Sequence, residues 1–309
     1  MPEALAFFRG KIVPLADAQV SITTHALHYG TAVFEGIRGN WNEEQNKLYV
    51  FRMREHYLRL LQGCKMMLMD IPYSADDLCG ITIELLQNCG YRQDLYIRPI
   101  AYKSEELVAN LRLQELSSDF ALITVPFGAY IETEGAIRCQ TSSWRRIDDT
   151  IIPPRVKIAG HYVNSILAKT EATLAGYDEA IMLNQDGNVS EGSGENLFLV
   201  SNGTLSTPLV AENNLIGITR DSATKIAAKE LGLNVVERSI RRSELYLADE
   251  VFLTGTAAHI TPVGELDNRP IGTGDVGPVT TRLREIYLNA IKGGNPDYLD
   301  WCTEVPLEA

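Results

Sequence analysis

The sequence contains no apolar run that approaches the ~20 residues needed to span a bilayer, and Met1-Pro2-Glu3 lacks the features of a secretory signal. Its five cysteines are scattered, odd in number and without any CxxC pair. We therefore expect reduced thiols and a cytoplasmic location. The five histidines form no HExxH motif, so no metal site is expected. His25 and His28 could share a helical face, but ordinary packing is the favoured interpretation.

Basic residues are also fewer than acidic residues. The chain has 28 Lys and Arg against 40 Asp and Glu, a net charge of −12. This balance argues against nucleic acid and anionic membranes as partners. Apolar residues are plentiful, at 45% of 309 residues, which suffices for two domains or one large domain.

The pattern of elements favours an α+β fold over a parallel α/β sheet, because strands and helices interleave with hairpins. Tight turns are predicted at Arg9-Gly10, Asp186-Gly187 and Asn202-Gly203. Strands are expected at 47–51, 95–102 and 120–125, within 179–205, and near Val235 and Val251. Helices are expected from Arg52 and at 74–89, 163–174, 221–231 and 278–291.

Local signals refine this pattern. Ser74, with Asp77 three residues later, predicts a capped helix start, and Gly90 predicts its end. Pro99 predicts that strand 95–102 has a free edge. Pro126, Gly128 and Gly135 indicate a connector, so we predict a small N-terminal domain at 1–125, an interdomain linker at 126–135 and a larger domain at 136–309.

The segment 190–196, Ser-Glu-Gly-Ser-Gly-Glu-Asn, places Glu191 and Glu195 on a glycine-rich bend between two apolar segments. A buried carboxylate is costly unless a cation or several donors meet it. The bend therefore predicts a cationic partner, and together with Lys157 it suggests the protonated ring nitrogen of a cofactor. The alternative is an acidic hairpin exposed to water.

Lys157 lies between Val156 and Ile158, just before a predicted helix. In a strand those neighbours would point to the opposite face and leave the amine alone on one side. A lysine in a partly dry cleft is nucleophilic toward a carbonyl. A surface lysine is the alternative.

Two segments could bind an anion. The run 217–221 leads directly into a helix, whose first N–H groups and dipole suit a phosphate, and Thr219 adds a hydroxyl. The run 254–258 follows an apolar strand with small residues. Arg59 is a third candidate. Each signal is weak alone, because Thr or Asp before a helix is usually an N-cap.

The run 272–277, Gly-Thr-Gly-Asp-Val-Gly, matches the dinucleotide pattern G-x-G-x-x-G. That pattern requires a preceding strand within a βαβ unit. Here a polar stretch precedes it and Pro278 follows, so we expect a loop. A nicotinamide dehydrogenase would depend on this match alone.

In order and spacing, many segments resemble the branched-chain amino-acid aminotransferases, fold-type IV enzymes that depend on pyridoxal 5′-phosphate. The resemblance covers nearly the whole chain. It is carried by HALHYGTAVFEGIR (25–38), FRMREHYLRL (51–60), YIRP (96–99), SSWRR (142–146), KIAGHY (157–162), SEGSGENLF (190–198), GITRD (217–221), LADEV (247–251) and GTAAHITPV (255–263).

The resemblance implies a large cofactor-binding domain with a β-barrel-like core. It implies that Lys157 binds the cofactor covalently and is the catalytic base, that Glu191 meets the pyridine nitrogen, and that Glu195 supports it. Tyr162 would lie near the phenolic oxygen. The phosphate side would be formed by Arg59, Leu215, Gly217, Ile218, Thr219 and Thr256.

For the substrate, the resemblance implies that Tyr96 and the backbone at Thr256 and Ala257 lie near the α-carboxylate. Arg98 would receive the side-chain carboxylate of glutamate. Phe34, Tyr29 and Tyr130 would line the side-chain pocket, with Tyr29 reaching across from a neighbouring subunit of a homodimer or higher homo-oligomer.

The implied reaction is ping-pong transamination of L-leucine, L-isoleucine and L-valine with 2-oxoglutarate. The alternatives within the fold are D-amino-acid or (R)-amine transaminases and aminodeoxychorismate lyase; outside it, a binding protein without catalysis. Three departures stand beside functional positions: His161 replaces a common Asn, His259 a common Glu, and Phe127 a frequent Trp.

Overall fold

The computed structural model describes residues 4–128 and 135–307, which fall into two compact units. The first unit comprises Met1–Gly128, Val156–Gly160 and Asn289–Ala309, and the second comprises Ala129–Arg155 and His161–Leu288. Most of the predicted linker 126–135 lies outside the described residues. The mixture of sheets and helices confirms the expected α+β class.

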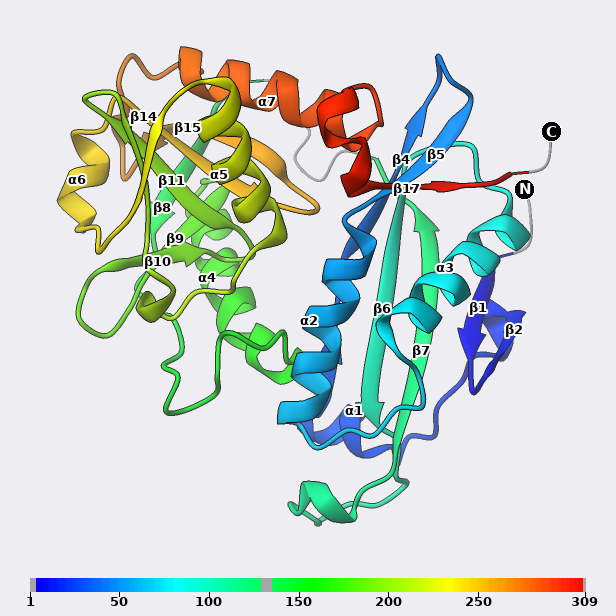
Figure 1. Cartoon of the computed structure of the whole chain (residues 1–309). Coiled ribbons are helices and arrows are strands. Elements are labelled where there is room, and N and C mark those ends of the chain that lie inside the picture. Colours follow the sequence, from blue (N-terminus) through cyan, green and yellow to red (C-terminus); the bar gives the residue numbers. More distant parts are fainter. Residues whose placement is uncertain (1–3, 129–134, 308–309) are drawn as a thin grey trace. The chain divides into compact units, whose positions relative to one another are not determined.

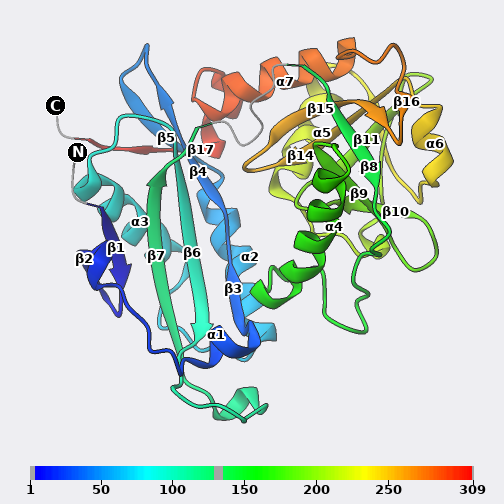
Figure 2. The ribbon, with the colours of Figure 1, turned by 180° about the vertical axis from the view of Figure 1, so that it is seen from behind.

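The first unit is built on an eight-stranded sheet with the order β17-β5-β4-β6-β7-β1-β2, and β3 also pairs with β6. Its strands are β1 Leu5–Phe8, β2 Lys11–Pro14, β3 Ala32–Phe34, β4 Ile37–Asn42, β5 Lys47–Phe51, β6 Leu95–Lys103, β7 Ser118–Pro126 and β17 Cys302–Val305. Helices α2 (Met53–Met66) and α3 (Ala75–Cys89) lie on one face of this sheet, while the short α1 (His25–Tyr29) lies near the end of β6 (Figures 1 and 2).

Helix α3 forms as its sequence predicts. The Ser74 hydroxyl accepts from the backbone of Asp77, whose carboxylate accepts in return from the Ser74 N–H. Gly90 ends the helix at φ +62°, a conformation that suits glycine. Leu78 and Leu85 are fully buried, so the apolar stripe provides the packing that stabilises the helix.

The predicted free edge at Pro99 is wrong, because β6 is an interior strand paired with β7 on one side and with β3 and β4 on the other. Pro99 lies opposite the break between β3 and β4, where its carbonyl accepts from the Glu35 N–H at 3.0 Å. In an antiparallel ladder the N–H and C=O of one residue face the same neighbour. The missing N–H of Pro99 therefore faces this break, and no regular ladder bond is lost.

The second unit contains a curled nine-stranded sheet with the order β10-β9-β8-β15-β14-β11-β12-β13, and β16 pairs with β15 (Figure 1). Its strands are β8 Ile137–Thr141, β9 Glu179–Leu183, β10 Val189–Gly192, β11 Asn196–Ser201, β12 Thr204–Thr207, β13 Asn234–Glu237, β14 Glu250–Gly255, β15 His259–Leu266 and β16 Arg269–Pro270. The helices are α4 Tyr162–Leu174, α5 Ile218–Glu230, α6 Arg242–Tyr246 and α7 Pro278–Ile291. Apolar side chains from β9, β11, β14 and β15 form a core cluster.

Most local predictions hold in this unit. Asn202 and Gly203 form the two-residue turn between β11 and β12, both with positive φ. Helix α5 begins at Ile218, three residues earlier than predicted, because Gly217 in extended conformation serves as the N-cap. The segment 272–277 is a loop before α7, as expected.

The remaining expectations concern membrane spans, metal sites, His25 and the cysteines. The described residues contain no helix with the length and apolar character of a membrane span. Among the same residues no group of His, Cys, Asp and Glu is arranged to hold a metal. His25 is buried and bonded to Thr31 and to the Asn110 carbonyl, so it is a packed residue. All five cysteines are free thiols.

Candidate active site

Lys157 belongs to a short segment that joins the sheet of the first unit beside β3. The Phe34 N–H donates to the Lys157 carbonyl at 3.1 Å, and Ile158 bridges to Val33. Val156 and Ile158 are buried while Lys157 is half-buried. The segment is not a strand, yet its neighbours are buried as the sequence predicts. The Lys157 amine lies 5.3 Å from the centroid of the Phe34 ring, over its face.

Arg59 of α2 is held by a buried carboxylate that the sequence reasoning missed. Its Nε and one terminal nitrogen each donate to Glu35 at 2.7 Å, and His56 Nδ1 donates to the same carboxylate at 2.8 Å. Burial by itself would raise the pKa of the Glu35 carboxyl, but Arg59 and His56 hold that pKa well below its usual range. Burial lowers the pKa of His56, so its imidazole is neutral near pH 7.

Tyr96 and Arg98 are two residues apart on β6, so their side chains lie on the same face of the strand. The Arg98 guanidinium lies 4.5 Å from the Phe34 ring centroid and 5.1 Å from that of Tyr96, and it donates to the Tyr96 hydroxyl at 3.1 Å. A Cβ at Gly36 would come within 1.9 Å of this hydroxyl, so glycine makes room for Tyr96. The pair presents a cation and a hydroxyl beside an aromatic wall.

Phe127 packs against this group, with its ring centroid 5.2 Å from that of Tyr96. The Arg38 guanidinium covers the Phe127 ring at 5.2 Å. Tyr29 is 41% exposed, and its hydroxyl accepts from the Ala109 N–H at 2.9 Å. The predicted pocket residue Tyr130 lies outside the described residues.

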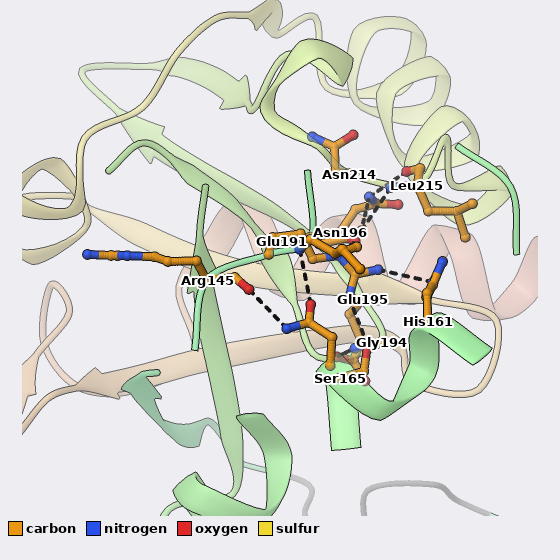
Figure 3. Close-up of polar contacts among 12 residues, drawn as sticks. Arg145, His161, Ser165, Glu191, Gly194, Glu195, Asn196, Asn214 and Leu215 are labelled. Atoms are coloured by element: carbon orange, nitrogen blue, oxygen red, sulfur yellow. Dashed lines mark hydrogen bonds and ion pairs between the residues drawn. The ribbon is translucent and has the colours of Figure 1, made fainter. Parts of the chain in front are cut away.

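In the second unit, the acidic bend is buried. All four residues of β10 are buried, so the alternative of a water-exposed acidic hairpin is wrong. Glu191 Oε1 lies 2.8 Å from Arg146 Nε, while its Oε2 accepts from the Asn196 amide at 3.3 Å and from the Leu215 N–H at 3.1 Å (Figure 3). The sequence predicted a cation at this carboxylate but did not identify Arg146 as one.

Glu195 lies close to Glu191 and is 4% exposed. One of its oxygens accepts from the Gly194 N–H at 3.1 Å (Figure 3). Burial raises the pKa of the Glu195 carboxyl to about 8, and the charges of Glu179 and Glu191 act in the same direction. Glu179 itself pairs with Lys169 at 2.5 Å.

The N-terminus of α5 has the features predicted for an anion site. Gly217 is the N-cap and no side chain caps the helix. A Cβ at Gly217 would come within 1.9 Å of Asn196 Oδ1, so only glycine fits. Ile218 and Thr219 are buried in the first turn, where backbone N–H groups lack intrahelical partners. The Asn196 amide also donates to the Leu215 carbonyl at 2.8 Å.

The second predicted anion segment follows β14, where Thr256 and Ala257 form a half-exposed turn. The buried Thr254 hydroxyl just before it has no hydrogen-bond partner among the described residues, and the same is true of the buried Ser190 hydroxyl beside Glu191 and of Asn214 Oδ1. Buried polar atoms are rarely left unsatisfied. These unsatisfied atoms belong to segments beside the Glu191 carboxylate and the start of α5, which no side chain caps. Such a set of polar groups fits a polar, phosphorylated cofactor.

Tyr162 begins α4, and its ring stacks on that of His161 at 5.1 Å with an interplanar angle of 9°. Each unit therefore gathers its own share of the predicted residues. The first brings together Lys157, Phe34, Tyr96 and Arg98, with Arg59 fixed by Glu35. The second connects Glu191, Leu215 and Gly217 through Asn196. The missed residues, Glu35, His56 and Arg146, gave no local signal because each acts through a partner distant in sequence.

Comparison with known proteins agrees with these features. Residues 32–266 match the family model described as amino-transferase class IV. The chain is 52% identical to the probable branched-chain-amino-acid aminotransferase of Aquifex aeolicus, over 97% of this chain and 96% of that one. It is 39% identical to the branched-chain-amino-acid aminotransferase of Escherichia coli K12, over 97% and 96%.

Solved structures give the same result. The branched-chain aminotransferase of Thermoproteus uzoniensis with norvaline superposes with a TM-score of 0.94 at 43% identity, covering 98% of this chain and 100% of that one. The T.th. branched-chain amino acid aminotransferase complexed with N-(5′-phosphopyridoxyl)-L-glutamate gives 0.92 at 43%, covering 98% and 99%. The PLP form from Thermobaculum terrenum gives 0.94 at 37%, covering 99% of each chain.

Proposed function

The chain belongs to the branched-chain-amino-acid aminotransferases of the class IV aminotransferase family, and from this membership we propose its substrates and the roles of its residues. It uses pyridoxal 5′-phosphate to transfer the amino group of L-leucine, L-isoleucine or L-valine to 2-oxoglutarate. The products are the branched 2-oxo acids and L-glutamate. A homodimer or larger homo-oligomer is the proposed assembly.

The observation that carries the proposal is the link made by Asn196. Its amide donates to the buried acid Glu191 and to the carbonyl of Leu215, on the segment that leads into α5. An anion for a protonated ring nitrogen and backbone donors for a phosphate therefore belong to one rigid piece of the second unit. This combination suits pyridoxal phosphate better than a nucleotide.

When bound, pyridoxal phosphate acts as an electron sink for the bond between Cα and its hydrogen. Lys157 would hold the cofactor covalently through Nζ, and its free amine would take the proton from the substrate Cα and return it. The amine lies over the Phe34 ring. The base therefore stands beside the apolar wall proposed for the substrate.

The remaining cofactor roles are proposed residue by residue. The Glu191 carboxylate would accept a hydrogen bond from the ring nitrogen, supported by Glu195, and Tyr162 would donate to the phenolic oxygen. The phosphate is met by Arg59, by Thr256 and by the segment of Leu215, Gly217, Ile218 and Thr219. Arg59 is suited to this role because Glu35 fixes its guanidinium by two bonds.

The proposed roles in substrate binding start from Tyr96 and Arg98, whose side chains lie on one face of β6. Tyr96, with the backbone at Thr256 and Ala257, binds the α-carboxylate, and Arg98 receives the second carboxylate of glutamate. Phe34, Tyr29 and Tyr130 enclose an aliphatic side chain. Arg98 stacked on Phe34 gives one pocket both an apolar wall and a cation, which two dissimilar substrates require.

An absorbance spectrum of the purified protein tests the proposal. L-Leucine should convert the cofactor band and 2-oxoglutarate should restore it, whereas D-alanine or an (R)-amine should act more slowly. Faster turnover of D-alanine or an (R)-amine than of L-leucine would instead indicate a different transaminase of the same fold. Light scattering on the same sample gives the oligomeric state.

A further inference from the structure

Arg146 is buried in the second unit beside the acidic bend. It is 3% exposed, and its N–H donates to the Leu183 carbonyl of β9 at 2.8 Å, which fixes its backbone to the sheet. The preceding residue, Arg145, is exposed, and its side chain points away from the acidic bend (Figure 3). Two consecutive arginines therefore occupy opposite environments.

The guanidinium of Arg146 forms an ion pair with Glu191, without regular hydrogen-bond geometry between Nε and Oε1, and is held on its other side by Ser165 and His161. Its Nε lies 2.8 Å from Glu191 Oε1, with the Glu191 side chain 5% exposed. One terminal nitrogen donates to the Ser165 hydroxyl at 2.8 Å, and the other faces His161 Nε2 at 3.5 Å. Ser165 lies on α4 and His161 immediately precedes it, so the helix sets the position of the cation and the cation sets the position of the acid (Figure 3).

Arg146 places a cation in contact with the buried Glu191 carboxylate. A carboxylate at this depth, with only neutral donors, would be driven toward its protonated form. Glu195 shows the outcome nearby, because no arginine or lysine among the described residues is in hydrogen-bonding contact with it and burial raises its pKa to about 8. A neutral acid at position 191 would not hold a ring nitrogen in its protonated form.

We propose that Arg146 is a positioning residue that keeps Glu191 ionised and correctly oriented for the ring nitrogen of the cofactor. The inference depends on the proposed function, since it assigns Arg146 to the same site. Arg146 touches neither substrate nor cofactor in this account and acts through Glu191 alone.

The test compares Arg146→Met with Arg145→Met, a matched control at the neighbouring exposed position, and with Arg146→Lys. Arg146→Met should lower kcat by ~10²-fold, the scale of a lost electrostatic stabiliser, and should weaken cofactor affinity measured by absorbance titration. Arg146→Lys should recover part of both. Arg145→Met should match the wild type, and equal effects of the two methionine variants would overturn the proposal.

Infrared spectroscopy supplies a readout that a purely structural role would not change. In apoprotein at neutral pH, Arg146→Met should show an additional protonated-carboxyl band that disappears in Arg146→Met/Glu191→Gln. Arg146→Met should also lower the thermal stability, because it leaves a buried carboxylate without its cation. The double variant should recover that stability, because a neutral amide needs no cation. If Arg146→Met does not fold, the double variant is compared with Glu191→Gln. Because Arg146 acts through Glu191 alone, these two variants should have equal kinetics and cofactor affinity, and a further loss in the double variant would reject the proposal. Wild-type protein that fails to bind cofactor at Lys157 would reject the proposed function instead.

Discussion

At the scale of single residues, each of the two units contains a buried carboxylate that is paired with an arginine. The Glu35 carboxylate is fully buried and pairs with the partly buried Arg59 and with the buried His56, while Glu191 and its partner Arg146 are both buried. Breaking such a pair by removing one partner is costly, because it leaves an uncompensated charge. In the first unit the Glu35 carboxylate holds Arg59 in a fixed position. In the second unit Arg146 holds the Glu191 carboxylate.

Glu35→Gln should weaken cofactor binding by about tenfold, the scale of a lost hydrogen bond to a charged group. The amide keeps the shape but removes the anion that orients Arg59. A fluorescence titration with pyridoxal phosphate measures the effect. Glu55→Gln is the matched control. Glu55 lies on α2, the helix that carries Arg59, and it also pairs with an arginine, Arg52, at 2.7 Å. Equal affinities of the two variants would contradict this role of Glu35.

Glu195 predicts a pH dependence of stability. Its folded pKa of about 8 lies above its ordinary value of 4.5, so the folded state holds this proton more tightly than the unfolded state. Its contribution is therefore fully present below ~4.5 and is lost as the pH rises through ~8. Glu195→Gln, which resembles the neutral acid, should lose less stability over this range than the wild type.

Thermal melts from pH 5 to 9 measure the difference between the two proteins. Parallel curves would show that Glu195 does not carry a proton at neutral pH. For catalysis the prediction concerns Glu191 instead: Glu191→Gln should reduce the rate of transamination at pH 7 by ~10²-fold.

At the scale of elements, the start of α5 depends on a glycine for steric reasons. Gly217 has φ −73°, which any residue adopts, but an added Cβ would come within 1.9 Å of Asn196 Oδ1. Gly217→Ala should displace Asn196, disturb its bonds to Glu191 and Leu215, and weaken binding of the phosphate. Inhibition by inorganic phosphate and cofactor affinity should both fall severalfold.

The control for this prediction is Gly80→Ala inside α3, where the added Cβ meets no atom within 4 Å. That change should stabilise the protein by about 0.5–1 kcal/mol through helix propensity and leave cofactor affinity unchanged. Wild-type affinity in Gly217→Ala would contradict the proposed phosphate site at α5.

Elements were predictable where their signals are local. The cap at Ser74, the stop at Gly90 and the turn at Asn202 were found because neighbouring residues determine them. Pro99 was misread because its effect depends on the strands beside it. A proline signals an edge only when its missing N–H would otherwise enter a regular ladder, and here it faces the break between β3 and β4.

At the scale of the whole molecule, the family was predictable from ordered motifs, but the charge pairs were not. Arg146 and Glu191 are 45 positions apart, as their numbers show, and Glu35 and Arg59 are 24 apart. No periodicity or spacing rule connects such residues, because the fold alone brings them together. The acidic bend correctly predicted a cation while leaving the chain's own arginine unidentified.

The central claim is that Lys157 carries the cofactor. Borohydride reduction of the purified protein, followed by proteolysis and mass spectrometry, should place a pyridoxyl phosphate adduct on the peptide containing Lys157, and Lys157→Ala should abolish both the adduct and turnover of L-leucine. An adduct on another lysine, or normal turnover by Lys157→Ala, would contradict the account.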